Sequence, residues 1–287
     1  LEQLKAGVEF NTYNLSNKGV ENESSSEASS AVGYISAFLI YFFIFFYGAQ
    51  IMRGVIEEKT SKVIEVIISS VKPFQLMMGK IIGVGAVGLT QFLLWTALST
   101  GIISVGSTIL LKDVEPDKIE SMVQDQPMKT PVKSDTGNVI FDALKKVNFS
   151  LVVGCFVFYF LGGYLLYGAL FAAVGSAVDS DADSQQFMLP ITIPLIFSMV
   201  IIAAILKEPH GSLAVWTSII PFTAPVVMMM RIPFDVPAWQ IAVSMLSVIG
   251  GFLATTWFAG RIYRIGIFMH GTKVNYKVLA KWFMMKI

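Results

Sequence analysis

The sequence predicts an all-α, polytopic membrane protein, and three observations support that fold class. Of the 287 residues, 54% are apolar and 14% are charged, whereas an ordinary soluble domain has about 25% charged residues. The mean hydropathy is +0.66. All charged residues lie outside five apolar segments, which are residues 33–52, 81–111, 149–178, 184–206 and 236–260. One or two long core helices of a soluble protein are a poor explanation for five such segments in one chain.

Each apolar segment is long enough to cross a bilayer as a helix, because about 20 helical residues cover about 30 Å. Backbone amides need partners in hydrocarbon, which leaves helices or a closed barrel, and the segments lack the period-two alternation of barrel strands. Residues 33–262 are therefore predicted to form a transmembrane domain with five helices.

The charge balance and the cysteine content exclude several other classes. The 21 basic and 20 acidic residues nearly cancel, so there is no strongly basic surface for a nucleic acid. The single cysteine, Cys155, lies inside an apolar segment, which indicates neither a disulfide framework nor a thiolate metal cluster. Partners are expected in or beside a membrane.

Basic residues predict the orientation of the chain. They are enriched in residues 53–80 and in the tail from 263–287, so both regions are expected on the cytoplasmic side of the cell membrane. Five crossings then place residues 1–32, the loop 112–148 and the loop 207–235 outside. A polar outer segment without a signal peptide predicts a further span before residue 1, and residues 1–32 are interpreted as the remnant of an outer region.

Residues 55–72, after the first span, have the period of an amphipathic helix. The face that is mostly apolar is formed by Ile56, Thr60, Val63, Ile64, Ile67 and Val71. Glu58 precedes Lys62 by four residues, which favours an ion pair on a helix. The segment is either a solvated connector on the lipid surface or a lever that transmits force between a soluble partner and the spans.

Residues 213–230 are apolar but are interrupted by Pro221 and Pro225. A sixth span here would place the basic C-terminus outside, against the positive-inside rule. The segment is therefore predicted to be a re-entrant pair of short helices on the outer side. The alternative is a proline-broken interfacial loop in which Arg231 extends its charge to water.

Two smaller patterns have structural interpretations. Asp179, Asp181 and Asp183 alternate like the start of a calcium-binding loop, but the required glycine and glutamate are replaced by Ser184 and Pro190. Asp183 or Ser184 is instead expected to cap the next helix. Small residues at four-residue spacing predict close helix packing, at Gly79 with Gly83, Gly168 with Ala172 and Ser176, and Gly250 with Ala254.

Three motifs resemble one family. Residues 57–73, EEKTSKVIEVIISSVKP, with residues 76–83, LMMGKIIG, closely resemble the segment after the second span of type-2 ABC exporter permeases, particularly the sodium-efflux branch. Residues 220–233, IPFTAPVVMMMRIP, are similar to the outer turn before that family's last span. The tail 261–271, RIYRIGIFMHG, is similar to its ending.

The resemblance implies a permease with six spans, of which the first, followed by a large outer domain, would precede this chain. Such permeases form homo- or heterodimers on two ATP-binding subunits, with residues 55–72 as the coupling helix. The positions carried over as facing the ATPase are Glu57, Glu58, Lys59, Lys62 and Glu65, and those near the outer gate are Pro221, Pro225 and Arg231.

The chain itself is expected to carry no catalytic, cofactor or metal site. The glycine-rich stretch 79–88 lacks the lysine-hydroxyl ending of a phosphate-binding loop, so ATP and Mg²⁺ are expected on the partner subunit. The predicted function is ATP-driven export, with sodium, a drug or a lipid as the substrate classes.

Two alternative functions fit the sequence less well. The pair Glu57 and Glu58 could serve an intramembrane metalloprotease, but His210 and His270 are predicted on opposite sides of the membrane, where they could not share a metal. An ion-coupled secondary transporter normally needs ionisable residues at the membrane midplane, and the five apolar segments contain none.

Overall fold

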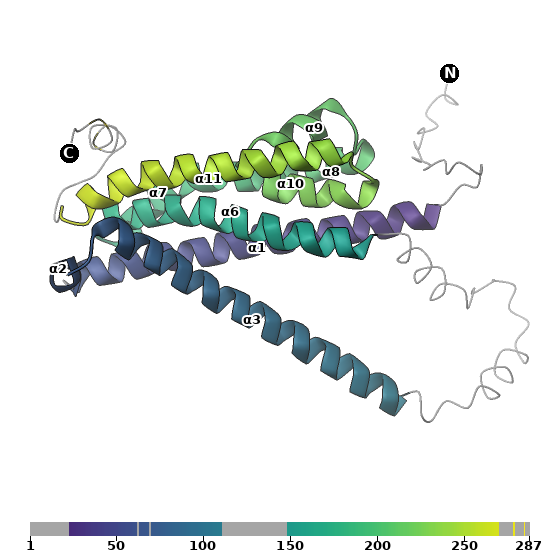
Figure 1. Cartoon of the computed structure of the whole chain (residues 1–287), viewed down its shortest axis with the longest axis horizontal. Helices are drawn as coiled ribbons and strands as arrows, with labels where there is room; N and C mark the ends of the chain where they lie inside the picture. Colours follow the sequence, from purple (N-terminus) through teal and green to yellow (C-terminus); the bar gives the residue numbers. More distant parts are fainter. Residues whose placement is uncertain are drawn as a thin grey trace, which may run out of the picture.

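The computed structural model describes residues 23–61, 63–68, 70–110 and 148–269, together with Val278 and Met284. Every regular element within these residues is a helix (Figure 1). Five stretches are long and apolar enough to cross a membrane, and each coincides with one predicted segment. The structure therefore confirms the fold class, an all-helical polytopic membrane protein.

The five long stretches are formed by α1 (Glu23–Thr60), α3 (Pro73–Leu110), α6 (Phe149–Ala177), α7 (Asp181–Val200) with α8 (Ile202–Lys207), and α11 (Ala238–Gly266). Four of the five extend beyond the predicted apolar segments at one or both ends, where polar residues continue the helix, and α6 matches its segment to within one residue.

Helix α6 lies at the centre of the bundle and packs along both α1 and α11 (Figure 1). Its buried tyrosines also bond to neighbouring elements. The Tyr164 hydroxyl donates to the carbonyl oxygen of Ile81 in α3 at 2.6 Å, and the Tyr167 hydroxyl donates to that of Phe222 at 2.7 Å. A hydroxyl buried among apolar side chains needs such an acceptor, so these bonds join α6 to α3 and to the turn at Phe222.

Short helices gather at one end of the bundle, opposite α2 (Val63–Ile68) (Figure 1). They are α8, α9 (Ser212–Ile219), α10 (Ala224–Arg231) and the 3-10 helix η1 (Ile232–Phe234). Residues 213–230 thus contain two short helices joined by a turn, and every residue of α10 is buried. We call this the α9 end of the bundle, and the opposite one the α2 end.

The expectation of one helix over residues 55–72 needs correction. Helix α1 continues without a break through Thr60, and α2 is a separate helix of six residues. The physical reason is burial, since Val55 and Ile56 pack into the core and keep this stretch in α1. The hydroxyl groups of Thr60 and Ser61 then donate back to carbonyl oxygens of the last turn, which is typical of a helix end.

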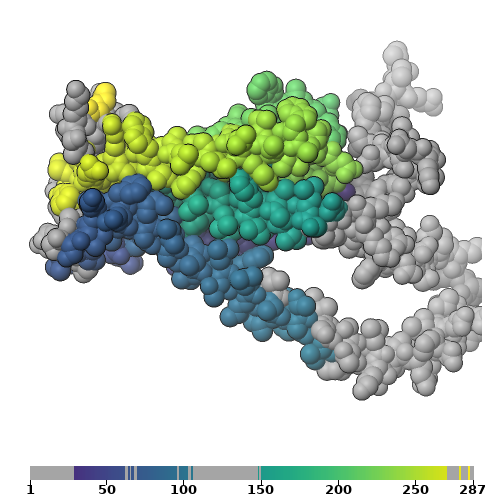
Figure 2. Space-filling model, viewed as in Figure 1, coloured from purple at the N-terminus to yellow at the C-terminus, as the bar shows by residue number. Residues whose placement is uncertain are grey.

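Helix α3 diverges from the other long helices beyond its first turns (Figures 1 and 2). Its span is 12% buried, the lowest fraction among the five. Leu93, Trp95 and Ile102 are each more than 60% exposed. Apolar exposure of this extent requires lipid or another protein segment around the helix.

Candidate functional site

The α2 end contains a fully buried basic side chain, Lys59, which is 0% exposed. Its Nζ lies 2.8 Å from the Ser176 carbonyl oxygen, 3.3 Å from that of Val178 and 2.8 Å from Asp179 Oδ1. The ammonium group thus contacts the last turn of α6 and the turn between α6 and α7.

This geometry corrects the prediction that Lys59 faces an ATPase. The family resemblance placed Lys59 at a partner-facing surface, but α1 packs along α6, and Lys59 turns inward to carbonyl groups at the α6 C-terminus. A partner protein cannot reach its ammonium group without moving α6. Lys59 is therefore an internal contact.

Glu58 is also paired within the chain. Its Oε1 lies 2.7 Å from Lys80 Nζ, which makes a contact from α1 to α3, and the predicted pairing of Glu58 with Lys62 stays a prediction. Lys62 lies outside the described residues, as does the side chain of Glu65.

The turn between α6 and α7 is closed by Ser180. Its Oγ accepts from the Asp183 backbone N–H at 3.2 Å, and its hydroxyl donates to Asp183 Oδ2 at 2.7 Å. Ser180 is the N-cap of α7, in place of the predicted Asp183 or Ser184. The reciprocal bonds resemble a capping box.

The predicted coupling residues therefore separate into distinct groups at the α2 end. Glu57 is exposed, Glu58 is paired with Lys80, and Lys59 is buried. Asp181 and Asp183, at the start of α7, are exposed as well. Solvent or a partner can therefore reach acidic side chains on both α1 and α7.

The α9 end contains a second buried basic side chain, Arg231. Its Nε donates to the Pro209 carbonyl oxygen at 2.8 Å, and its Nη2 donates to Gln240 Oε1 at 2.8 Å. Its Nη1 donates to Ser218 Oγ. Burial lowers the pKa of Arg231, and the neighbouring Tyr159 opposes this effect; a guanidinium nevertheless keeps its charge at neutral pH.

The Arg231 contacts correct the alternative in which this side chain extends to water, because Arg231 is 0% exposed. Its three acceptors come from the α8–α9 loop, from α9 and from α11. Gln240 and Ser218 were not predicted as site residues. The sequence contained one signal for Gln240 and Ser218, which is that each places an amide or a hydroxyl in an apolar stretch, where such a group needs a hydrogen-bond partner.

Both predicted gate prolines pack against glycines of long helices. A Cβ atom added at Gly163 of α6 would lie 2.9 Å from Pro225 Cβ, and one at Gly251 of α11 would lie 2.5 Å from Pro221 Cβ. The two proline rings are thus seated where α6 and α11 have no side chain. The structure brings Pro221, Pro225 and Arg231 to the same end of the bundle.

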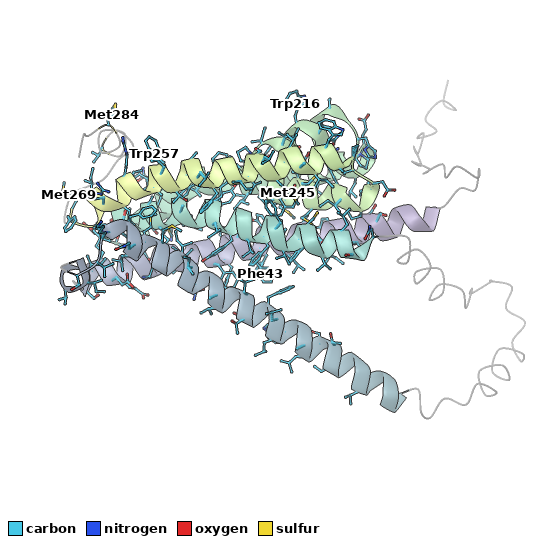
Figure 3. All side chains as sticks on the ribbon, in the orientation of Figure 1. Phe43, Trp216, Met245, Trp257, Met269 and Met284 are labelled. Atoms are coloured by element: carbon cyan, nitrogen blue, oxygen red, sulfur yellow. The ribbon has the colours of Figure 1, made fainter. Side chains whose placement is uncertain are left out.

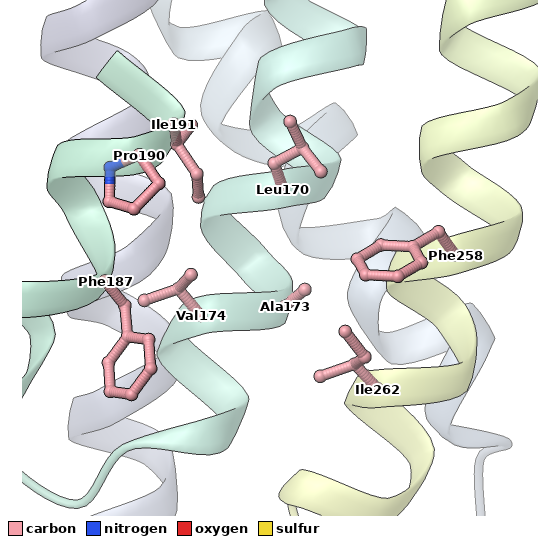
Figure 4. Close-up of a pocket in the computed structure, with 8 residues that line it drawn as sticks. All are labelled: Leu170, Ala173, Val174, Phe187, Pro190, Ile191, Phe258 and Ile262. Atoms are coloured by element: carbon pink, nitrogen blue, oxygen red, sulfur yellow. The ribbon is translucent and has the colours of Figure 1, made fainter. Parts of the chain in front are cut away.

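Two hollows lie along the helices. One, of about 230 Å³, lies between α6, α7 and α11 and is lined by eight apolar residues (Figure 4). The other, of about 590 Å³, lies between α1 and α3, where Phe43 is labelled in Figure 3. It is rich in aromatic residues and includes Gln91, whose Oε1 accepts from the Tyr47 hydroxyl at 3.2 Å.

Exposed tryptophans lie toward both ends of the bundle. Trp216 and Trp257 point away from it near opposite ends (Figure 3), and both are exposed. The Arg261 guanidinium lies 4.5 Å from the centre of the Trp257 ring. Tryptophan and arginine in such places are typical of the two membrane–water interfaces. Together with the five spans, this defines a multi-pass membrane protein.

Comparison with known proteins specifies the class. Residues 2–261 match the family described as ABC-2 family transporter protein, and the chain belongs to this family. This family comprises membrane proteins of ABC transporters.

Two relatives extend this finding. The uncharacterized protein YhaP of Bacillus subtilis (strain 168) is 32% identical over 264 residues, which cover 90% of this chain and 57% of YhaP. The uncharacterized protein MJ1024 of Methanocaldococcus jannaschii is 24% identical over 270 residues, which cover 94% of this chain and 57% of MJ1024. The chain therefore spans little more than half the length of these relatives. No solved structure matches it.

Proposed function

We propose that this chain is the permease part of an ATP-driven exporter that moves its substrate out of the cytoplasm. The observation that carries the proposal is the family match over residues 2–261. Five helices that can cross a membrane are consistent with it. The sodium-efflux resemblance of residues 57–73 belongs to the same proposal.

ATP hydrolysis then takes place on a separate ATP-binding subunit, which holds ATP and Mg²⁺. The coupling contact is proposed at the α2 end, which lies on the cytoplasmic side together with the C-terminus. Glu57 is the best-placed of the five predicted coupling residues, because its side chain is exposed on the last turns of α1. A second permease subunit, identical or related, completes the transporter in the membrane lipid.

The outer gate is proposed at the α9 end, around Pro221, Pro225 and Arg231. Movement of α1 and α3 at the α2 end would reach this region through α10, which packs against α1. Sodium, a drug and a lipid remain the substrate classes of the proposal. The hollows on the helices are mostly apolar, which favours an amphipathic molecule over a bare ion.

Co-purification tests this function. The full-length tagged protein is extracted from its own membranes in mild detergent, and the eluate is analysed by mass spectrometry and by an ATPase assay. We expect a stoichiometric ATP-binding subunit and vanadate-sensitive hydrolysis. Recovery of the intact protein alone, without ATPase activity in repeated preparations, would contradict the proposal.

The coupling surface has its own test. Glu57→Lys reverses an exposed charge and should reduce the amount of ATP-binding subunit that co-purifies, while the protein still inserts into membranes. Lys207→Glu, an exposed charge reversal on the α8 side, is the matched control and should leave co-purification unchanged. Equal loss in both variants would remove Glu57 from the coupling contact.

A further inference from the structure

Two consecutive side chains at the end of α1 contact different parts of the bundle. Glu58 reaches α3 through Lys80, and Lys59 reaches the turn between α6 and α7. The contact of Lys59 joins residues that lie 117 to 119 positions apart in the chain. The end of α1 is therefore tied to both of its neighbours in this region.

The Lys59 ammonium is held by two hydrogen bonds and one ion pair. A lysine carries three hydrogens on Nζ and accepts no hydrogen bond, and three oxygen atoms surround it: the carbonyl oxygens of Ser176 and Val178, and Asp179 Oδ1. The carboxylate balances the charge, and the carbonyl groups take the other two hydrogens. A buried cation needs both kinds of partner.

The Ser176 carbonyl group is one that α6 leaves without a helical partner, and the Val178 carbonyl group belongs to the C-cap residue just beyond the helix. Helix α6 ends at Ala177, and the last four carbonyl groups of a helix have no donor within that helix. A cation at this terminus is also favoured by the helix dipole. Lys59 thus acts as a C-terminal cap of α6 that is contributed by α1.

Close backbone contacts hold the capped turn in place. A Cβ atom added at Gly175 would lie 2.6 Å from the Met52 carbonyl oxygen of α1, and one at Gly266 of α11 would lie 2.8 Å from the Ser176 carbonyl oxygen. Helices α1 and α11 therefore approach the end of α6 to backbone distance. This leaves little room for Lys59 to adopt another position.

We propose that Lys59 is a positioning residue that locks the end of α1 to the α6–α7 turn. The exposed acidic residues Glu57 on α1 and Asp181 on α7 then belong to one rigid body. A displacement of the end of α1 therefore also displaces the α6–α7 turn, and the reverse. The link between α1 and the α6–α7 turn does not depend on the proposed function. A role of this link in coupling to an ATP-binding subunit rests on that function.

Hydrogen exchange of the full-length protein in lipid nanodiscs tests the link. Lys59→Met keeps the length of the side chain and removes the ammonium group. The amides to follow are those of Val178 and Ser184, which donate to Val174 and Ser180 on the two sides of the turn. We expect their exchange to accelerate by about tenfold or more, since a half-buried carboxylate and two carbonyl groups lose this partner.

Two controls separate a local link from general destabilisation. Glu57→Gln changes the exposed neighbour and should leave exchange at the turn unchanged. The Val227 amide in α10, which donates to the carbonyl oxygen of Thr223 just before that helix, lies at the α9 end and should keep its wild-type exchange in Lys59→Met. Equal acceleration at Val227 and Val178, or unchanged exchange at Val178, would overturn the proposal.

Conservative variants give a graded test that does not depend on Lys59→Met being stable. Asp179→Asn keeps an acceptor and both carbonyl contacts, so it should accelerate exchange less than Lys59→Met, and Lys59→Arg should restore part of the protection. The double variant Lys59→Asp with Asp179→Lys swaps the two charges. It should not restore the protection, because a carboxylate at position 59 would face two carbonyl oxygens. Full protection in this double variant, or an unchanged rate of hydrogen exchange in Asp179→Asn, would contradict the capping role.

The exchange measurement needs no ATP-binding subunit. Absence of ATPase activity in the wild-type preparation would therefore overturn the proposed function and leave the link intact. Conversely, an active complex with unchanged exchange in Lys59→Met would overturn the link alone.

Discussion

Lys59 and Arg231 are buried basic side chains at opposite ends of the bundle, and each is surrounded by oxygen atoms. Lys59 has one carboxylate and two carbonyl partners, whereas the hydrogen-bond acceptors of Arg231 are a carbonyl, a hydroxyl and an amide. A buried charge is costly to leave without partners. Both side chains therefore hold several segments in one arrangement.

Replacement of Arg231 should destabilise the α9 end. Arg231→Met removes three hydrogen bonds and leaves Gln240 and the Pro209 carbonyl group without their donor. We expect a loss of about 2 to 5 kcal/mol in the free energy of unfolding, measured by tryptophan fluorescence in mixed micelles with increasing denaturing detergent, since each buried neutral acceptor left unpaired costs about 1 to 3 kcal/mol. Arg264→Met, at an exposed position, should change it by about 0.5 kcal/mol or less. Similar losses in both variants would argue against the buried network.

At the scale of helices, packing is decided by glycines that face a neighbour, and the spacing identified only some of them. The expected set of Gly168 with Ala172 and Ser176 is confirmed, since a Cβ atom at Gly168 would lie 3.0 Å from Ile51 Cδ1 and the other two residues are buried. Gly79, Gly83 and Gly250 have open space where a Cβ atom would lie, whereas Gly163 and Gly251 face the rings of Pro225 and Pro221. Four-residue spacing identifies a smooth helix face. It does not identify what that face contacts.

Alanine substitutions on α6 should separate these two kinds of glycine. Gly163→Ala introduces a methyl group 2.9 Å from Pro225 Cβ, and a rigid ring cannot move aside cheaply. We expect destabilisation of about 1 to 3 kcal/mol in the same mixed-micelle titration. Gly154→Ala, with nothing within 4 Å on the same helix, should be neutral or stabilising. A larger loss for Gly154→Ala would contradict the packing described.

Helix α3 should tolerate truncation of its outer side chains better than α1 does. Ile44 of α1 is 0% exposed and Leu94 of α3 is 53% exposed. Ile44→Ala should cost about 2 to 5 kcal/mol because it leaves a cavity in the core, and Leu94→Ala should cost about 1 kcal/mol or less. If Leu94→Ala costs as much in the purified protein, α3 packs against another segment along this face.

At the scale of the whole molecule, the α2 and α9 ends are expected on opposite sides of the membrane. The basic residues near α2 and the exposed tryptophans toward both ends agree with that orientation. The acidic residues Asp181 and Asp183 at the α2 end do not oppose it, because acidic residues contribute little to the positive-inside rule.

Labelling of single cysteines measures this orientation. Ser61→Cys at the α2 end and Ser212→Cys at the α9 end are both exposed positions, and the native Cys155 is buried. With a membrane-impermeant maleimide on intact cells, we expect Ser212→Cys to be labelled and Ser61→Cys to react only after the cells are opened. Labelling of Ser61→Cys from outside would reverse the topology, and the wild-type chain serves as the control for Cys155.

Much of the fold could be predicted from the sequence because a bilayer leaves few alternatives. Five charge-free segments of sufficient length must be helical in hydrocarbon, and the structure has helices over all five. The limits of α1 were harder to predict. Residues 53–60 are polar enough to suggest a surface helix, yet Val55 and Ile56 pack in the core, and only the neighbouring helices decide that.

The sequence by itself determined the fold class and the positions of the spans, because both depend on hydropathy along the chain. Only the tertiary structure decided which charges are available to a partner. The family resemblance grouped Glu57, Glu58 and Lys59 at one surface, but Glu58 contacts Lys80 and Lys59 contacts residues more than one hundred positions away. Whether a charged side chain faces a partner or the core depends on acceptors that other helices bring to it, and local sequence does not contain them.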